Sequence, residues 1–181
     1  GDESKGIFVS DLKGTLTPEM IKILDMIAEH NDNCKGDTVA LATCHVFNEE
    51  KYDISKYVHD RGMKVPIVHD HITQEMTQLT TEEALELIDL GTYVEICANS
   101  TVPWTSMQNW IVAWDYNLEM TKTLLKERGP EHICLITDSG LSGYNETEGM
   151  RMLIRGLLKA GVSEEDIHYM AAIAPAAAIG I

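Results

Sequence analysis

The chain has 181 residues, of which 44% are hydrophobic, and a formal net charge of −15 at pH 7. A chain of this length can bury one ordinary core, so we expect a single domain over residues 1–181. The acidic balance argues against nucleic acid or an anionic membrane as the main partner, because both favour basic surfaces. No apolar stretch approaches the roughly 20 residues of a membrane span, and the opening GDESKG is too polar for a signal peptide. We therefore expect a soluble, cytoplasmic protein.

Short apolar runs alternate five times with amphipathic helical segments along the chain. The first strand is expected at Ile7–Ser10, and its helix begins at Pro18 with Thr17 as the cap. The second strand runs up to His45 and leads to a helix near residues 49–61. The first two strand-helix units are thus bounded by recognisable residues.

The remaining three units follow the same alternation. The third strand ends at His69, and a capping box at Thr80 and Glu83 opens the next helix. The fourth strand, TYVEICA, precedes a long segment and a helix near residues 118–128. The fifth strand ends at Asp138. Two more helices follow it. Asn145 is the expected cap of the first, Gly161 ends that helix, and Ser163 is the expected cap of the second.

All-apolar strands that alternate with amphipathic helices are typical of a parallel sheet covered by helices, an α/β fold. A complete (β/α)8 barrel of the TIM type needs about 250 residues, so five strand-helix units do not close one. The sheet is therefore either open or part of a barrel.

Several predicted strands end on a single ionisable residue. His45, His69 and Asp138 follow apolar runs, and Glu95 lies inside the fourth run. The carboxyl ends of parallel strands share one rim, where distant residues converge. Two imidazoles and a carboxylate suit a divalent transition metal, with zinc first and manganese, iron or nickel as alternatives. Asp138 is also the candidate proton acceptor, although each histidine alone could simply end its strand.

Four further residues are weaker candidates for the same site. His71 would share a side with His69 if the strand continued, but a loop position fits it equally well. Glu95 would hydrogen-bond a ligand histidine or form a buried structural pair. Trp104, on the long segment, and Ser139, next to Asp138, are candidates for the substrate pocket. Local packing would also explain the tryptophan.

Several stretches together resemble a known pattern: GTLTPEMIKILDMIAEH, LATCH, KVPIVH, LGTYVE, GPEHICLITDSG, EGMRMLIRGLLKAGVSEEDI and MAAIAPAAAIGI. They are similar to the C-terminal half of the amidohydrolase superfamily of metal-dependent hydrolases, and most similar to an uncharacterised branch of it. The resemblance spans nearly the whole chain. Its most specific parts are the aspartate before SGLSGYN and the ending in which a helix led by SEED runs into M-x(4)-P-A.

The resemblance implies a distorted (β/α)8 barrel of which this chain forms strands 4 to 8. It makes His45 the metal ligand of strand five, His69 that of strand six, and Asp138 the ligand and general base of strand eight. Asp11 falls near the end of strand four, where members with two metals carry a bridging lysine or acid. Lys13 is close enough to compete for that position.

The superfamily's H-x-H motif on strand one has no counterpart in this chain. We therefore expect a second polypeptide, or a removed segment, to supply strands 1 to 3 and two more histidines, and we expect an oligomer. The implied activity is hydrolysis of an amide, cyclic amide, ester or lactone bond in a small molecule by metal-activated water.

Two other functions remain open at this stage. IFVSDLKGTLTP resembles the first motif of haloacid dehalogenase-type phosphatases, which would make Asp11 a nucleophile assisted by magnesium. Lys13, however, stands where that family commonly has a second aspartate. A non-catalytic scaffold or regulatory subunit is the other alternative. Metal content separates the three, because a scaffold needs none and a phosphatase needs only magnesium.

Overall fold

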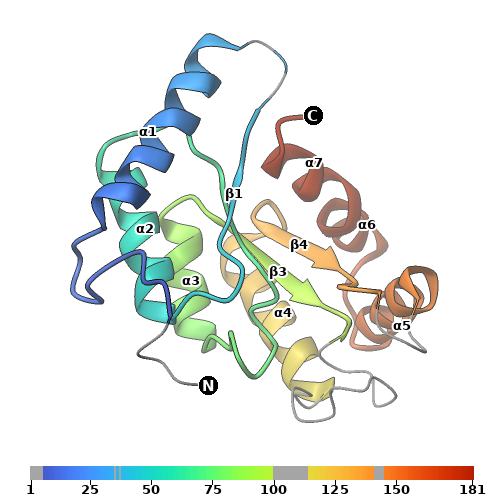
Figure 1. Ribbon diagram of the computed structural model, residues 1–181. Coiled ribbons are helices and arrows are strands. Elements are labelled where there is room, and N and C mark those ends of the chain that lie inside the picture. Colours follow the sequence, from blue (N-terminus) through green and yellow to red (C-terminus); the bar gives the residue numbers. More distant parts are fainter. Residues whose placement is uncertain (1–5, 35, 37, 100–113, 141–144) are drawn as a thin grey trace.

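Four parallel strands form one sheet in the order in which they occur along the chain (Figure 1). This computed structural model describes residues 6–34, 36, 38–99, 114–140 and 145–181. The strands are β1 (Leu41–Ala42), β2 (Ile67–His69), β3 (Tyr93–Cys97) and β4 (Ile133–Ile136). A helix connects each strand to the next, so the expected parallel α/β fold is confirmed.

Side-chain caps begin several helices where the sequence predicts them. Thr17, Thr80, Asn145 and Ser163 each accept a hydrogen bond from a backbone N–H of the following first turn. The helices are α1 (Pro18–Asn33), α2 (Asn48–Asp60), α3 (Thr81–Asp89), α4 (Trp114–Arg128), α5 (Glu146–Lys159), α6 (Glu164–His168) and α7 (Ala174–Ala178), with a π-helical turn at Tyr169–Ile173. Within the described residues, no helix is both long and apolar enough to span a membrane.

The expected first strand, Ile7–Ser10, does not form. The Val9 N–H donates to Glu50 Oε1 of α2 at 2.6 Å, and the Val9 carbonyl accepts from the Thr17 N–H at 2.9 Å. Apart from an isolated antiparallel bridge between Ser10 and Leu16, this segment is irregular. Its backbone groups therefore bond to a carboxylate and to the start of α1, in place of a neighbouring strand.

Helix α4 begins earlier than the predicted residues 118–128. It starts at Trp114, whose partly buried ring packs against the largest core cluster. Gly156 of α5 lies against this ring so closely that a Cβ atom there would overlap it. Trp114 is therefore a packing residue between α4 and α5.

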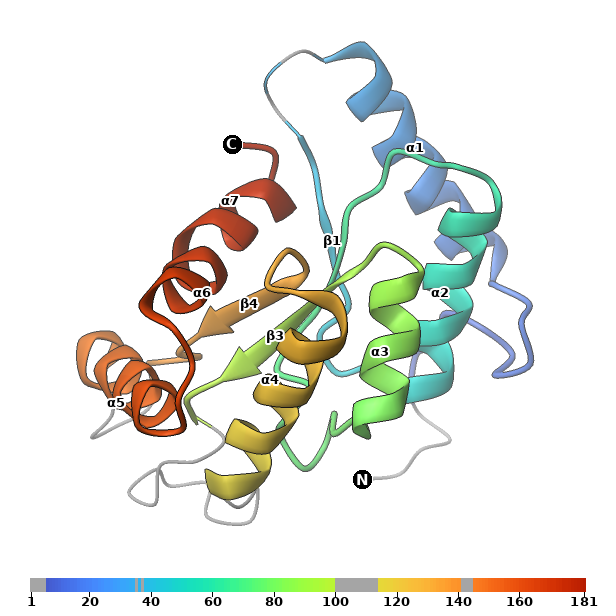
Figure 2. The ribbon, with the colours of Figure 1, turned by 180° about the vertical axis from the view of Figure 1, so that it is seen from behind.

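Helices lie on both faces of the sheet. Val94, Ile96, Ile133 and Leu135 face α3, α4 and α5, which Figures 1 and 2 show from opposite sides. Because side chains alternate along a strand, the intervening residues point to the opposite face. There, Val68 and Cys134 pack against Ala174 and Ala178 of α7.

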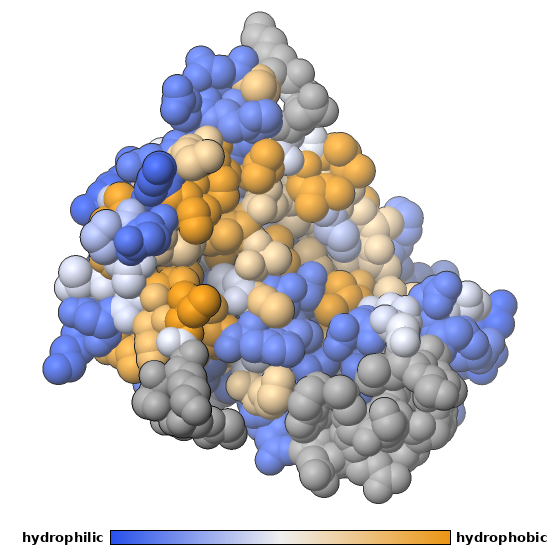
Figure 3. Space-filling view, viewed as in Figure 1, coloured by the Kyte–Doolittle hydropathy of each residue, from blue (hydrophilic) through white to orange (hydrophobic). Residues whose placement is uncertain are grey.

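Helix α1 packs on α2 rather than across the sheet centre. Leu24 of α1 and Ile54 of α2 belong to one buried cluster with Ile67 of β2. Figure 3 shows apolar side chains gathered at the centre of the face that also presents α1 and α7. Large apolar side chains stay exposed on α1 and on the C-terminal helical segment, among them Ile23, Met26, Ile173 and Ile179.

Candidate metal centre

Two histidines meet beyond the carboxyl ends of the neighbouring strands β1 and β2. The Nε2 atoms of His45 and His71 are 3.0 Å apart, and their rings stack with centroids 4.8 Å apart. The Thr77 hydroxyl donates to the His71 carbonyl at 2.8 Å, so its oxygen is left to accept from the His71 Nδ1–H at 3.4 Å. This network assigns the neutral Nδ1–H tautomer to His71 and turns its Nε2 lone pair toward His45.

Asp138 follows β4 and is oriented by two side-chain amides. Its Oδ2 accepts from Gln74 Nε2 at 2.6 Å and from Asn99 Nδ2 at 3.2 Å. Sequence reasoning missed both amides. Asn99 directly follows the fourth apolar run, which was a usable signal, whereas nothing around Gln74 marked it. The two amides restrict the aspartate to one orientation and leave Oδ1 to act as an acceptor.

Glu95 lies between the histidine pair and Asp138, on β3. The pKa of its carboxyl is raised to about 7, chiefly by burial and also by the negative charges of Asp70 and Asp138, while the His71 N–H, 3.4 Å from Oε2, opposes the shift. Burial also lowers the pKa of His71. Near neutral pH the His71 ring is therefore uncharged, and the Glu95 carboxyl readily takes up a proton.

Three of the strand-end loops contain a non-glycine residue in the left-handed region. The φ angles are +51° for Cys44, +34° for His71 and +50° for Asp138. Such conformations cost of order 1–2 kcal/mol each for residues other than glycine. Because the strand ends before His71, alternation does not apply to it. Cys44 is exposed and not part of the core.

His69 does not join this group. It is the last residue of β2 and shares the helix-facing side of the strand with Ile67. Its Nε2 lies 3.0 Å from Ser55 Oγ and its Nδ1 lies 3.3 Å from Thr43 Oγ1. Since the Ser55 hydroxyl donates to the Lys51 carbonyl, it accepts from His69, and both ring nitrogens are engaged.

Burial of His69 also suppresses its positive charge. The side chain is fully buried. Desolvation, together with the nearby charge of Lys51, lowers the pKa of His69 to about 3. The structure thus gives His69 a structural environment between the sheet and α2, and it brings His71 to the position at the strand ends that the sequence had suggested for His69.

Asp11 and Lys13 form a turn of their own. The Asp11 Oδ1 accepts from the backbone N–H groups of Lys13 and Thr15, both at 2.9 Å, and these bonds lower the Asp11 pKa. Both Asp11 and Lys13 are exposed. A nucleophilic Asp11 of the phosphatase type would need a preceding strand, and residues 7–10 do not form one.

The structure describes one of the two candidates for the substrate pocket. Ser139 is half-buried and directly follows Asp138. Trp104 lies outside the described residues, as does Trp110.

A divalent metal fits the His45–His71 pair in part. Two nitrogens bound tetrahedrally to zinc at their usual bond lengths lie about 3.3 Å apart, and the observed separation is 3.0 Å. Among the described residues, however, no three His, Cys, Asp or Glu side chains are placed to hold one ion together. The pair would supply two of the four ligands of a tetrahedral zinc site.

A comparison with models of protein families identifies the family of this chain. A family model covers residues 2–95, slightly more than half of the sequence, and its description is a family of unknown function, DUF6282. The chain belongs to this family. No curated protein matches the sequence.

Three solved structures share the fold with this chain. The phosphotriesterase homology protein from Escherichia coli, complexed with phosphate in its active site, matches with a TM-score of 0.66 and 18% identity over 93% of this chain and 57% of that one. An amidohydrolase from Burkholderia multivorans with bound zinc matches with a TM-score of 0.63 and 13% identity over 91% and 58% of the two chains.

A variant of organophosphorus hydrolase from Deinococcus radiodurans also matches, with a TM-score of 0.60 and 14% identity over 94% of this chain and 53% of that one. At these identities the likeness is one of fold, and it confirms the partial barrel-type architecture. The chain spans somewhat more than half the length of each of these three structures.

Proposed function

We propose that this chain is part of a metal-dependent hydrolase that acts on an amide, cyclic amide, ester or lactone bond of a small molecule. The observation that carries the proposal is the pair of imidazole Nε2 atoms 3.0 Å apart at the ends of two adjacent parallel strands. A divalent ion, zinc in the first place, would supply the Lewis acidity that activates a water molecule for attack.

Each residue of the candidate centre has a distinct role in this proposal. His45 and His71 hold the ion, and Thr77 keeps the His71 lone pair turned toward it. Asp138 accepts the proton of the attacking water at Oδ1, because Gln74 and Asn99 both bond to Oδ2. Glu95 acts as a nearby proton reservoir, since its raised pKa lies close to neutrality.

The rest of the barrel and two further ligands come, in this proposal, from a second polypeptide or from a segment that has been removed. One observation supports it: apolar side chains such as Ile23 and Met26 stay exposed. An assembled protein would cover such side chains, because large exposed apolar surface usually marks an interaction site.

Native mass spectrometry of the protein purified from its own source tests metal and partner together. We expect one or two transition-metal ions and a second polypeptide. The variants His45→Ala and His71→Ala should each lose the metal. His59→Ala is the matched control, because His59 is an exposed histidine on α2 whose ring contacts the Leu90 carbonyl.

The role of Asp138 is tested by turnover. A panel of chromogenic esters, lactones and amides identifies a reporter substrate, and Asp138→Asn should lower kcat on it by a factor of about 100 to 10,000, as is usual when a general base is removed. A metal-free wild-type protein would favour the scaffold alternative. Unchanged turnover in Asp138→Asn would contradict the assigned proton acceptor.

A further inference from the structure

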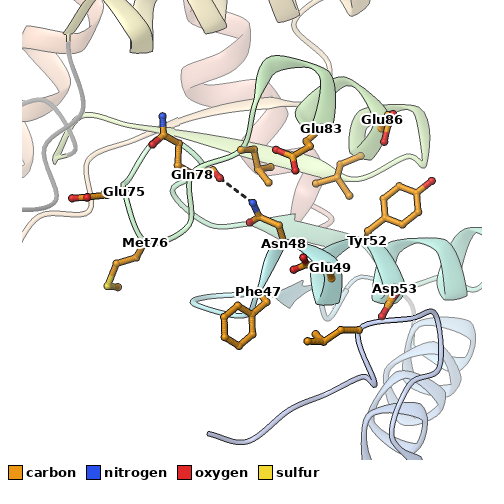
Figure 4. A pocket seen from close by; sticks show the side chains of 13 residues that line it. Phe47, Asn48, Glu49, Tyr52, Asp53, Glu75, Met76, Gln78, Glu83 and Glu86 are labelled. Carbon is orange, nitrogen blue, oxygen red and sulfur yellow. Dashed lines mark hydrogen bonds between the residues drawn. The ribbon is translucent and has the colours of Figure 1, made fainter. Parts of the chain in front are cut away.

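A pocket lies between α2, α3 and the loop before α3 (Figure 4). Its volume is about 560 Å³, within the range of small-molecule sites. It is lined by Leu12, Phe47, Asn48, Glu49, Tyr52, Asp53, Glu75, Met76, Gln78, Leu79, Glu83, Glu86 and Leu87. The candidate metal centre contributes none of these residues, so the two sites can be tested separately.

Asp53 is the unusual member of the lining. The residue is only 9% exposed, and its Oδ2 is buried without a hydrogen-bond partner among the described residues. Leaving a buried carboxylate oxygen unpaired destabilises the folded protein. By contrast, the other buried carboxylate of this helix, Glu50, accepts from the backbone N–H groups of Val9 and Phe47. Asp53 thus lines the pocket with a carboxylate whose charge is not balanced by a hydrogen bond at Oδ2 among the described residues.

The electrostatics of the pocket favour a cation. Glu49, Glu75, Glu83 and Glu86 line it together with Asp53, and none of its described lining residues is Lys, Arg or His. A buried lysine nearby, Lys51, donates to Asn48 Oδ1 and to the Thr77 carbonyl, at 3.2 and 3.0 Å. Lys51 offsets part of the negative charge, because it lies close enough to Glu83 to attract it, but carboxylates remain in excess in the lining.

The walls of the pocket favour an organic rather than a bare metal cation. Phe47, Tyr52 and Met76 are each exposed by more than 40%, and the Phe47 ring stacks on Phe8 with centroids 5.7 Å apart. Aromatic faces attract ammonium groups, and leucines such as Leu79 complete an apolar lining. A hydrated divalent ion would gain nothing from these contacts.

We propose that this pocket binds an organic ammonium ion that carries an apolar group. The ammonium nitrogen pairs with the Asp53 carboxylate, which lines the pocket, while Phe47 and Tyr52 contact the charged group and the neighbouring apolar portion. The proposal is independent of the hydrolase function, since it uses other residues.

Isothermal titration of the whole protein with benzylammonium and with neutral benzyl alcohol tests the proposal. We expect benzylammonium to bind at least tenfold more tightly, as a charge-assisted hydrogen bond provides. Asp53→Asn should raise the Kd of benzylammonium about tenfold and leave that of benzyl alcohol unchanged. The matched control is Asp25→Asn, which removes one charge from an exposed position on α1 and should change neither Kd beyond about twofold.

Equal Kd values for the two probes, or the absence of binding at 10 mM, would overturn the proposal. The comparison on the wild-type protein needs no variant, so a folding defect in Asp53→Asn leaves the test intact. Benzylammonium binding that is the same in Asp53→Asn and the wild type would also overturn it.

The ammonium group can come from a free amine or from a lysine side chain of another protein. A short peptide with one lysine between leucines, compared with its acetyl-lysine form, separates these sources. Tighter binding of the lysine peptide than of benzylammonium indicates a protein partner, and the reverse order indicates a small amine. Metal content should remain that of the wild type in Asp53→Asn, so failure of this proposal and failure of the hydrolase proposal give different results.

Discussion

Replacing the buried His69 with glutamine should remove a large part of the pH dependence of folding stability. In the folded protein the pKa of His69 is lowered to about 3, whereas an unfolded histidine has a pKa of about 6.5. Below pH 6.5 the unfolded chain therefore binds a proton that the folded protein does not. The free energy of unfolding must fall as the pH falls from 6.5 toward 3.

The size of this effect follows from the two pKa values. Between pH 7 and pH 5 the unfolded histidine goes from mostly neutral to almost fully protonated, which lowers the free energy of unfolding by about 2 kcal/mol. Glutamine does not titrate in this range. The variant will be less stable at both pH values, because it loses packing and one of the bonds to Ser55 and Thr43. The informative quantity is therefore the difference between pH 7 and pH 5, compared between variant and wild type.

Urea unfolding followed by circular dichroism at pH 7 and pH 5, at constant ionic strength, measures this quantity. We expect the decrease in the free energy of unfolding from pH 7 to pH 5 to be smaller by about 2 kcal/mol in His69→Gln than in the wild type. His59→Gln, an exposed replacement on α2, should keep the wild-type difference. The same pH dependence in His69→Gln and in the wild type would refute the burial argument and return His69 to the list of metal ligands.

Three further changes probe the same strand ends and the core. Above pH 7, Glu95→Gln should be more stable than the wild type by about 2–3 kcal/mol, and the difference should vanish below pH 4.5. The reason is that the pKa of the Glu95 carboxyl is raised to about 7 in the folded protein, so its ionised form destabilises the fold. Urea unfolding across pH 4 to 8 measures this difference. Gly156→Ala should lower the free energy of unfolding by about 1–3 kcal/mol because the added methyl group meets the Trp114 ring. Helix propensity alone predicts a more stable variant, so a rise in the free energy of unfolding would contradict the close packing of Trp114 on Gly156. Cys44→Gly should raise the melting temperature by relieving about 1 kcal/mol at its positive φ, whereas the control Cys34→Gly, at an exposed residue with a φ of −97°, should lower it.

Local sequence signals were sufficient where one turn of chain decides the structure. Thr17, Thr80, Asn145 and Ser163 cap helices as predicted, because a cap depends on a side chain and an N–H three residues away. The alternation of apolar runs with amphipathic helices likewise determined the parallel sheet, since each pattern suits only one kind of packing.

The tertiary structure decided which polar residues meet. A strand between Ile7 and Ser10 satisfied the local pattern, but the Glu50 carboxylate, about 40 residues away, binds its backbone N–H groups. Nothing in the sequence revealed that His69 would face α2, or that a positive φ would turn His71 toward His45. Which side of a strand is buried, and where the strand stops, depend on neighbours distant in sequence. The sequence pattern therefore predicted the edge of the sheet at which polar side chains gather. Only the packing of α2 against the sheet decided that His71, and not His69, lies beside His45 there.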